Sequence, residues 1–335
     1  MNFMRYALIA TLCIGQLAFA QQRKAGLTGA AFLKVGVGAK AVAMGSAATA
    51  FAGDVNQMFW NPAGITLTDE KLQATFSYNK WIADLSHNSA GVTYQLDGIG
   101  TIGVGVISFG VSGIPADRDI PLDPVLVKHQ IETNTSSTYD YQDLAVQLSF
   151  ARYVIERLSL GATVKMVSQT IDGISISAIA FDFGSVYHIG VLDWTIAARF
   201  NNLGSSMKFY DIAYGLPLSF SIGTAMAPVT IGDSKVMLAL DALKPQDGPQ
   251  YIYAGAEYSY ADMVSVRGGW RLNYSGTTDD ATSTRAAINN TIEGFSAGAG
   301  VNTMIAGYSV RVDYSYSEMQ LLDAAHRVSL TFGMR

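Results

Sequence analysis

The 335-residue sequence predicts an all-β protein whose strands close into a barrel across a membrane. Three observations predict this fold class: only 15% of the residues are charged, apolar and polar residues alternate along most of the chain, and the longer connections fall on one side. Soluble domains usually carry about 25% charged residues. We therefore expect much of this surface to face lipid rather than water.

Residues 1–20 are predicted to be a signal peptide. Arg5 precedes a mostly apolar stretch, and Ala18-Phe19-Ala20 is an A-x-A cleavage site. The single cysteine, Cys13, lies within the apolar stretch, so the mature chain is expected to need neither a disulfide nor a metal-thiolate site.

Alternation with period two begins at Leu72. From Ser309 to Tyr316, valine and tyrosine side chains share one face, while serine, arginine and aspartate share the other. About fourteen such segments are found, each roughly 9 to 12 residues long, which is the length that crosses a bilayer at a tilt. They lie near residues 72-80, 88-96, 100-109, 140-151, 157-168, 176-187, 193-202, 216-226, 234-243, 250-259, 262-272, 293-302, 307-316 and 326-334.

The connections indicate how such a barrel is oriented. Lipid satisfies no backbone group, so spanning strands must close, and outer-membrane barrels have short turns inside and long loops outside. If the first strand runs outward, the external loops are 81-87, 110-139, 169-175, 203-215, 244-249, 273-292 and 317-325. A soluble β-sandwich would also alternate, but it would not explain the low charge content. The sequence therefore predicts the outer membrane of a Gram-negative bacterium, with lipid around the wall.

Charged residues occupy the face that would line the lumen. Glu257 is expected to pair with Arg267, and Asp241 with Arg267 or Arg271, which would hold neighbouring strands together. A polar path for a solute is the alternative use of the same residues. The predicted lumen charge network comprises Asp241, Glu257, Arg267, Arg271, Arg311 and Asp313, and Lys165, Asp182, Arg199 and Arg327 share its face.

The segment before the first strand does not alternate. Its alanines favour a short helix near residues 39–48, Asp54 can cap a turn over 55–59, and Asn61-Pro62 is expected to end any helix that follows. A compact, uncharged segment suits the lumen of a barrel this wide, which side chains alone would not fill. We predict residues 21–70 as a periplasmic or hatch segment and 71–335 as the barrel. The predicted hatch turn is Trp60, Asn61, Pro62, Ala63 and Gly64.

The sequence predicts no enzyme, cofactor or metal site. His87, His129, His188 and His326 fall at expected loops or strand ends, where exposed or interfacial positions are the simplest interpretation. The Gly-x-Ser-x-Gly spacing at residues 294–298 lies in a predicted strand, without the strand-to-helix turn that a nucleophilic serine needs. The net charge of -5 argues against a nucleic-acid partner.

"FLKVGVGAKAVAMGSAATAFAGDVNQMFWNPAGIT" at residues 32–66 and "YAGAEYSYADMVSVRGGW" at 253–270 carry a family resemblance. So do "LDALKP" at 240–245, "VDYSY" at 312–316 and "HRVSL" at 326–330. The chain resembles the PorV/PorQ family of outer-membrane proteins, which are similar to the FadL-type fatty acid transporters. The resemblance implies a fourteen-stranded barrel with an N-terminal hatch. Gly64 stands where the PorV type has lysine and the PorQ type has leucine.

Two functions are compatible with these observations. The resemblance implies an accessory or shuttle component of type IX protein secretion, whose external loops 110-139 and 273-292 bind secreted cargo proteins or a translocon subunit. The alternative is a FadL-like passive transporter of hydrophobic molecules, with a lateral opening where Gly100, Gly103, Gly105, Gly110 and Gly113 kink the third strand. The same glycines are equally compatible with ordinary small residues that face the lumen. The many lumen charges favour the first function, because a pocket for an apolar substrate carries few polar groups.

Overall fold

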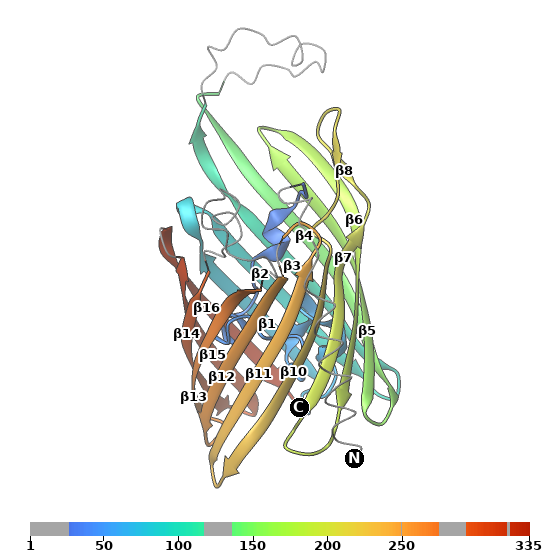
Figure 1. The fold of residues 1–335 in the computed structure, drawn as a ribbon, viewed down its shortest axis with the longest axis vertical. Helices are drawn as coiled ribbons and strands as arrows, with labels where there is room; N and C mark the ends of the chain where they lie inside the picture. Colours follow the sequence, from blue (N-terminus) through green and yellow to red (C-terminus); the bar gives the residue numbers. More distant parts are fainter. Residues whose placement is uncertain (1–26, 117–135, 249, 275–292, 320–321) are drawn as a thin grey trace.

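The chain folds into a closed antiparallel barrel of fourteen strands (Figure 1), which confirms the predicted fold class. The computed structural model describes residues 27–116, 136–248, 250–274, 293–319 and 322–335. The predicted signal peptide and most of the loops 110-139 and 273-292 lie outside these residues. No helix in the described part of the chain is long and apolar enough to cross a membrane.

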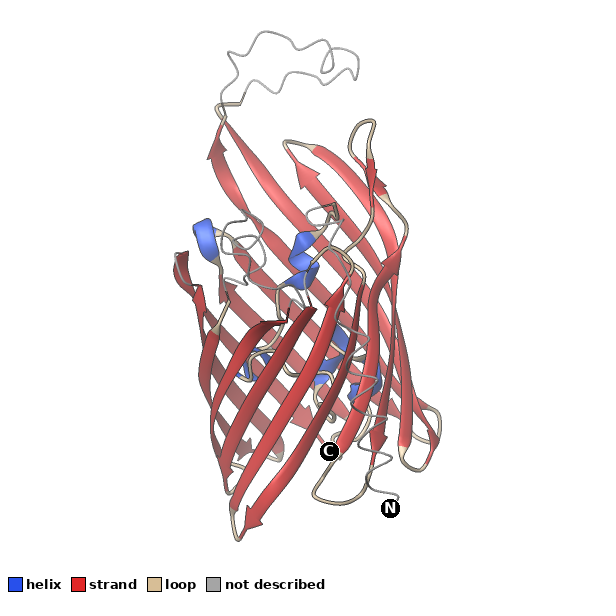
Figure 2. Ribbon diagram, in the orientation of Figure 1, coloured by secondary structure: helices blue, strands red, loops and turns tan. Residues whose placement is uncertain are grey.

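Each predicted segment corresponds to one strand of the barrel wall (Figure 2). Sequence neighbours pair around the wall except that β7 pairs with β10, and β1 pairs with β16 to close it. The short hairpin of β8 (Met207–Lys208) and β9 (Ala213–Tyr214) stands between β7 and β10 in the sequence. The wall strands are β1 Leu72–Lys80, β2 Ser86–Leu96, β3 Gly100–Pro115, β4 Thr138–Ile155, β5 Leu158–Ile171, β6 Ile174–His188, β7 Thr195–Gly204, β10 Ser219–Ile231, β11 Ser234–Pro245, β12 Gln250–Tyr260, β13 Val264–Tyr274, β14 Phe295–Ile305, β15 Tyr308–Met319 and β16 Leu322–Met334.

The alternation places apolar side chains outside and polar side chains inside, as predicted. On β15 and β16, Val312 and Phe332 are exposed, whereas Asp313 and Arg327 are buried in the lumen. The outward face therefore forms the apolar band that a lipid bilayer requires.

The two ends of the barrel differ in the length of their connections. The end that carries residues 97–99, 156–157 and 232–233 has short turns, and we take it as the inner end. The opposite, outer end carries the longer connections, such as residues 205–218, which contain the small β8–β9 hairpin. Strands β3 to β6 reach further outward than the alternation indicated, so the predicted loop 169-175 shrinks to a turn between β5 and β6.

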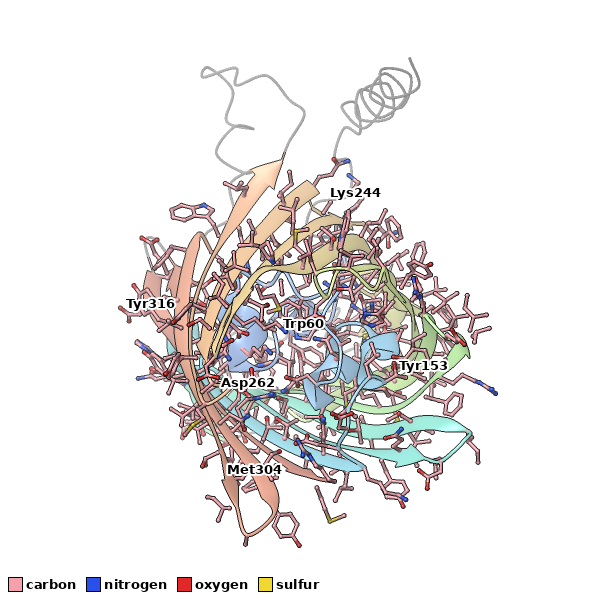
Figure 3. The ribbon with its side chains drawn as sticks, turned by 90° about the horizontal axis from the view of Figure 1, so that it is seen from below. Trp60, Tyr153, Lys244, Asp262, Met304 and Tyr316 are labelled. Carbon is pink, nitrogen blue, oxygen red and sulfur yellow. The ribbon has the colours of Figure 1, made fainter. Side chains whose placement is uncertain are left out.

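Residues 36–66 lie inside the barrel, and we call them the plug. They contain α2 (Ala39–Ala43) and the 3-10 helices η3 (Val55–Phe59) and η4 (Pro62–Ile65), and Trp60 lies near the centre of the lumen (Figure 3). A 3-10 helix of the outer loops, η5, spans Ile82–Asp84. The plug itself consists largely of small residues, because bulkier side chains would not fit in a lumen that already contains the inward side chains of the wall.

The helices of the plug differ in detail from the prediction. Helix α2 is shorter than expected because the chain turns at Gly45 and Ser46, which both have positive φ. Asp54 caps η3 as predicted, accepting a hydrogen bond from the Asn56 amide at 2.8 Å. As predicted, η3 ends just before Asn61-Pro62. The sequence did not indicate that a further helix starts there: Asn61 caps η4 and Pro62 is its first residue, where a missing N–H costs nothing.

Residues 27–35, which we call the rim segment, lie at the outer end rather than on the periplasmic side. This segment includes the 3-10 helix η2 (Ala31–Lys34). Gly29 donates its amide to the Gly215 carbonyl at 2.9 Å, and Lys34 pairs with Asp247 in the connection after β11. Phe32 stacks on Phe109 near the outer end of β3. The described chain therefore begins at the outer rim, fills the lumen and reaches β1 at the inner end.

The proposed glycine kink in the third strand is wrong for the segment that spans the membrane. Strands β2 and β3 stay in continuous register from Ser86↔Gly110 to Leu96↔Gly100. On the lumen face, a Cβ added to Gly105 would meet Met58 at 2.7 Å and Phe59 at 2.9 Å. Gly103 and Gly105 therefore make room for the plug as small lumen-facing residues.

Candidate functional site

The predicted hatch turn is buried against the wall. A Cβ added to Gly161 of β5 or to Gly184 of β6 would collide with Pro62 and Ala63 or with Asn61. The Asn61 side-chain amide donates to the carbonyls of Thr49 at 2.8 Å and Ser185 at 3.2 Å. The turn therefore connects another part of the plug to β6, and two wall glycines allow this close approach.

Trp60 is the hub between the plug and β7. Its indole N–H donates to the Val37 carbonyl at 2.8 Å, which ties the two halves of the plug together. Its own carbonyl accepts from Arg199 Nη1 at 3.1 Å and from Asn201 Nδ2 at 2.9 Å. The Arg199 guanidinium also lies over the Trp60 ring, 5.2 Å from its centroid, which is a cation–π arrangement.

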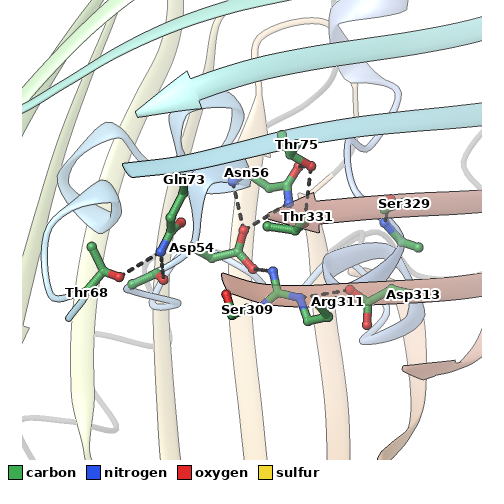
Figure 4. A network of polar contacts seen from close by, with 12 residues as sticks. Asp54, Asn56, Thr68, Gln73, Thr75, Ser309, Arg311, Asp313, Ser329 and Thr331 are labelled. Carbon is green, nitrogen blue, oxygen red and sulfur yellow. Dashed lines mark hydrogen bonds and ion pairs between the residues drawn. The ribbon is translucent and has the colours of Figure 1, made fainter. Parts of the chain in front are cut away.

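Four of the predicted network residues form a chain of ion pairs that reaches the plug. Arg267 pairs with Glu257, as predicted, and with Asp313 at 2.6 Å. Arg311 pairs with Asp313 at 3.1 Å and with Asp54 of the plug at 2.5 Å (Figure 4). We call these five residues the plug clamp. It binds the start of η3 to β12, β13 and β15.

The predicted pairing of Asp241 with Arg267 or Arg271 is wrong. Asp241 and Arg271 both face the lumen, but Tyr253 lies between them in the row across β11, β12 and β13. Asp241 instead accepts the backbone amide of Thr49 at 2.8 Å, and Arg271 contacts Ser46 and Glu293. Because the plug fills the lumen, these wall charges contact plug residues rather than one another.

The Asp54 carboxylate stabilises the docked plug. Burial raises the pKa of Asp54, but the charges of Arg311 and Lys40 and the hydrogen bonds from Asn56 lower it by more, from 3.8 to about 2. The ionised form is therefore favoured when the plug is docked, with a contribution of about 2 kcal/mol.

We expect this contribution to be complete above pH 4 to 5 and to be lost as the pH falls through 3.8 towards 2. Pepsin works in this range, so the rate at which it cleaves within the plug measures undocking. The rate should rise over this window in the wild type and less steeply in Asp54→Asn, which cannot titrate there. Equal pH dependence in both proteins would contradict the assignment to Asp54.

A cavity of about 400 Å³ lies on the outer side of the plug. It reaches from Asp247 and Glu293 at the outer end down to Trp60, and we call it the outer cavity. Its apolar lining includes Leu33, Val35, Val37, Phe59, Trp60, Ile107, Leu243, Tyr251 and Tyr253, and its polar lining includes Gln147, Lys165, Arg199, Asn201, Asn202 and Arg271.

A bulge in β7 shapes this cavity. One residue of β6, Asp182, stands opposite Asn201 and Asn202, and Asn202 has a φ of 64°. Asp182 accepts the Asn202 amide at 2.8 Å, and Lys165 pairs with Asp182 at 2.7 Å. Sequence reasoning missed Gln147, Asn201 and Asn202 as lining residues. The adjacent asparagines, which break the alternation, were the available signal of a bulge.

A smaller cavity of about 160 Å³ lies on the inner side of the plug, beside Phe51, Lys40, His188 and Met237. Thr49 belongs to the layer between this inner cavity and the outer cavity. Its hydroxyl lies 2.9 Å from the Ser221 hydroxyl and accepts from Arg199 Nε at 2.9 Å. The plug residues around Thr49 therefore separate the two spaces.

The histidines are not gathered in one place. His87 is buried against Phe109, not exposed or interfacial as expected, because β2 starts early enough to turn its side chain inward. His188 and His326 lie in strands, and His129 lies outside the described residues. Within the described ranges, no group of three or more His, Cys, Asp or Glu side chains could hold a metal ion.

No protein-family description and no curated protein matches the sequence. Among solved structures, the toluene transporter TodX of Pseudomonas putida matches with a TM-score of 0.58 and 11% identity over 89% of this chain and 97% of that chain. The CymD monoaromatic hydrocarbon channel matches with a TM-score of 0.54 and 12% identity over 89% of this chain and 96% of that chain. The chain has a TodX-like outer-membrane barrel fold. The protein is therefore placed in the outer membrane of a Gram-negative bacterium.

The fourteen-stranded barrel with an N-terminal segment in its lumen, which the sequence resemblance implied, is present in the structure. The PorV/PorQ family and a role in type IX secretion find no support in these comparisons. The fold alone does not decide what passes through the barrel or binds to it.

Proposed function

We propose that the protein is a non-enzymatic channel that carries small, largely apolar molecules passively across the outer membrane. The outer cavity is the observation that carries this proposal. Its volume of about 400 Å³ lies in the range of ligand pockets. Aromatic and aliphatic side chains form one part of its lining, and polar and charged side chains form the other. The names of the two matching barrels, a toluene transporter and a monoaromatic hydrocarbon channel, support the same class of cargo.

This proposal replaces the secretion role as the leading one. The loops that would bind cargo proteins lie mostly outside the described residues. Four of the lumen charges that favoured a binding role form ion pairs within the plug clamp, with one another and with Asp54. They stabilise the docked plug and need no bound protein to pair them.

Transport requires part of the plug to move. The outer and inner cavities end on either side of Thr49, whose contacts with β7, β10 and β11 are hydrogen bonds. The plug clamp holds a different part, at Asp54, through ion pairs. We infer that the segment around Thr49 moves away from β10 and β11 while the clamped part stays in place.

Locking this segment should stop transport. The Thr49 and Ser221 hydroxyls are 2.9 Å apart, so cysteines at both positions are close enough to form a disulfide between plug and wall. In a Gram-negative host without its own hydrocarbon channel, oxidised Thr49→Cys/Ser221→Cys should reduce uptake of labelled toluene to the level of cells without the protein. Reducing agent should restore uptake.

The matched control joins two wall strands. Ser149→Cys/Thr163→Cys replaces hydroxyls 2.7 Å apart on β4 and β5, and its disulfide should leave uptake unchanged because no plug residue is tied. Uptake that does not differ between cells with and without the wild-type protein would refute the channel itself. Full uptake by the oxidised plug-to-wall variant would refute the moving segment.

A further inference from the structure

We propose that the outer cavity binds an amphipathic ligand whose polar end is a hydroxyl group, such as a phenol or an alcohol, in preference to a plain hydrocarbon. This inference rests on the proposed channel function and defines its substrate more narrowly. It follows from the polar groups that the cavity buries.

Two buried amide oxygens at the cavity have no hydrogen-bond partner among the described residues. Asn201 is 6% exposed, and its amide nitrogen is used by the Trp60 carbonyl, whereas its Oδ1 is unpaired. Gln147 is 3% exposed, its nitrogen donates to the Met58 carbonyl at 2.8 Å, and its Oε1 is unpaired. Because each nitrogen has a carbonyl acceptor, both oxygens are oriented to accept from something else. Buried acceptors without donors are costly, so a donor is expected there.

A donor stands beside the first of these acceptors. Arg199 uses Nε on the Thr49 hydroxyl and Nη1 on the Trp60 carbonyl. Those bonds occupy only part of the donor set of a guanidinium, and Arg199 forms no ion pair with any carboxylate of the described residues. Arg199 and Asn201 meet at the same Trp60 carbonyl, so a single small group can contact both.

A hydroxyl is the group that satisfies this arrangement. Its oxygen can accept a hydrogen bond from Arg199, while its O–H donates a hydrogen bond to Asn201 Oδ1 or Gln147 Oε1. A carboxylate has only acceptors and would face the two amide oxygens, and an ammonium would be repelled by Arg199 and Lys165. A hydrocarbon would leave both amide oxygens unpaired. The apolar body of the ligand would lie along Phe59, Trp60 and Tyr251, which line the same cavity.

The test compares two probes of nearly identical shape, 4-ethylphenol and 4-ethyltoluene, which differ by a hydroxyl in place of a methyl group. Dissociation constants are measured by calorimetry on the purified chain in detergent. We expect the phenol to bind at least about tenfold more tightly, because sites built to pair a hydroxyl reject analogues that lack it. In Asn201→Leu and, separately, in Gln147→Met, the ratio of the two dissociation constants, 4-ethyltoluene over 4-ethylphenol, should fall towards one.

The control variant is Gln73→Met. Gln73 on β1 also donates its amide to a plug carbonyl, that of Gly53 at 3.1 Å, but it does not line the outer cavity. It should keep the phenol preference, which separates loss of ligand contacts from loss of a plug contact. Using both cavity variants keeps the test decisive if one of them fails to fold.

The outcomes separate this inference from the channel proposal. Equal binding of the two probes, or tighter binding of 4-ethylbenzoate, would overturn the hydroxyl site and leave a channel for apolar molecules in place. A phenol preference that survives both cavity variants would also overturn it, because the site would lie elsewhere. No binding of any probe would count against the cavity as a substrate site and hence against the proposed function.

Discussion

Replacing Gly269 with valine is expected to displace the plug, whereas the same replacement at the adjacent Gly268 is expected to change little. Gly269 faces the lumen, and a Cβ added there would collide with the backbone of Met44 and Gly45. A Cβ on Gly268 would meet nothing within 4 Å. The two positions are neighbours on β13, so the change in strand propensity is the same at both and cancels in the comparison.

The collision at Gly269 cannot be relieved by a side-chain rotation, because the obstructing atoms are backbone. Gly255, which pairs with Gly269 across β12 and β13, also contacts the backbone of Met44. On the plug side, Gly45 has a φ of 66°, and a Cβ added to it would lie only 2.6 Å from the Trp270 backbone nitrogen. Three glycines thus meet where the plug passes β12 and β13. Overpacking a core usually costs about 1 to 3 kcal/mol, and a clash with fixed backbone belongs at or above the top of that range.

Trypsin provides the measurement for this pair of variants. Lys40 lies in helix α2 inside the barrel, so cleavage after it reports displacement of the plug. Gly269→Val should be cleaved there quickly and should show larger conductance in planar bilayers, while Gly268→Val should resemble the wild type. Equal cleavage of the two variants would mean that this contact does not hold the plug.

The wall of the barrel was predictable because its signals are local. The alternation from Ser309 to Tyr316 indicates which side chains face lipid, and the loop lengths indicate which end of the barrel is the outer one. The ends of the strands were less predictable, because β5 and β6 continue beyond the alternating segments with polar and apolar residues that a loop could also contain.

The interior was predictable only in outline. A segment without alternation could be assigned to the lumen, but its contacts join residues that are far apart in the sequence, such as Asp54 with Arg311 and Gly45 with Gly269. Strand register fixes which wall residues are neighbours, and it correctly suggested Glu257 with Arg267. It failed for Asp241 because the occupant of the lumen, and the Tyr253 ring between the two charges, decide which partners a wall charge meets.

Replacing Arg311 with methionine is expected to loosen the plug by about 3 kcal/mol, since removing one member of a buried ion pair leaves the other charge uncompensated. Arg311 contacts Asp54 on the plug and Asp313 on the wall. Asp313 keeps Arg267 as a partner, but Asp54 loses its only ion pair among the described residues. The loss should therefore fall on plug docking more than on the wall.

Urea titration followed by trypsin cleavage at Lys40 measures docking, and the electrophoretic mobility of the unheated barrel measures the wall. The control is Lys71→Met, which removes an ion pair with Asp97 whose side chains are 43% and 79% exposed. Such exposed pairs contribute little to stability. Combining Arg311→Met with Asp54→Asn should recover part of the loss, because the carboxylate left behind is then neutral. A double variant that loses the full sum of the two single effects would show that the residues act independently, and the plug clamp would then not be what holds η3 to the wall.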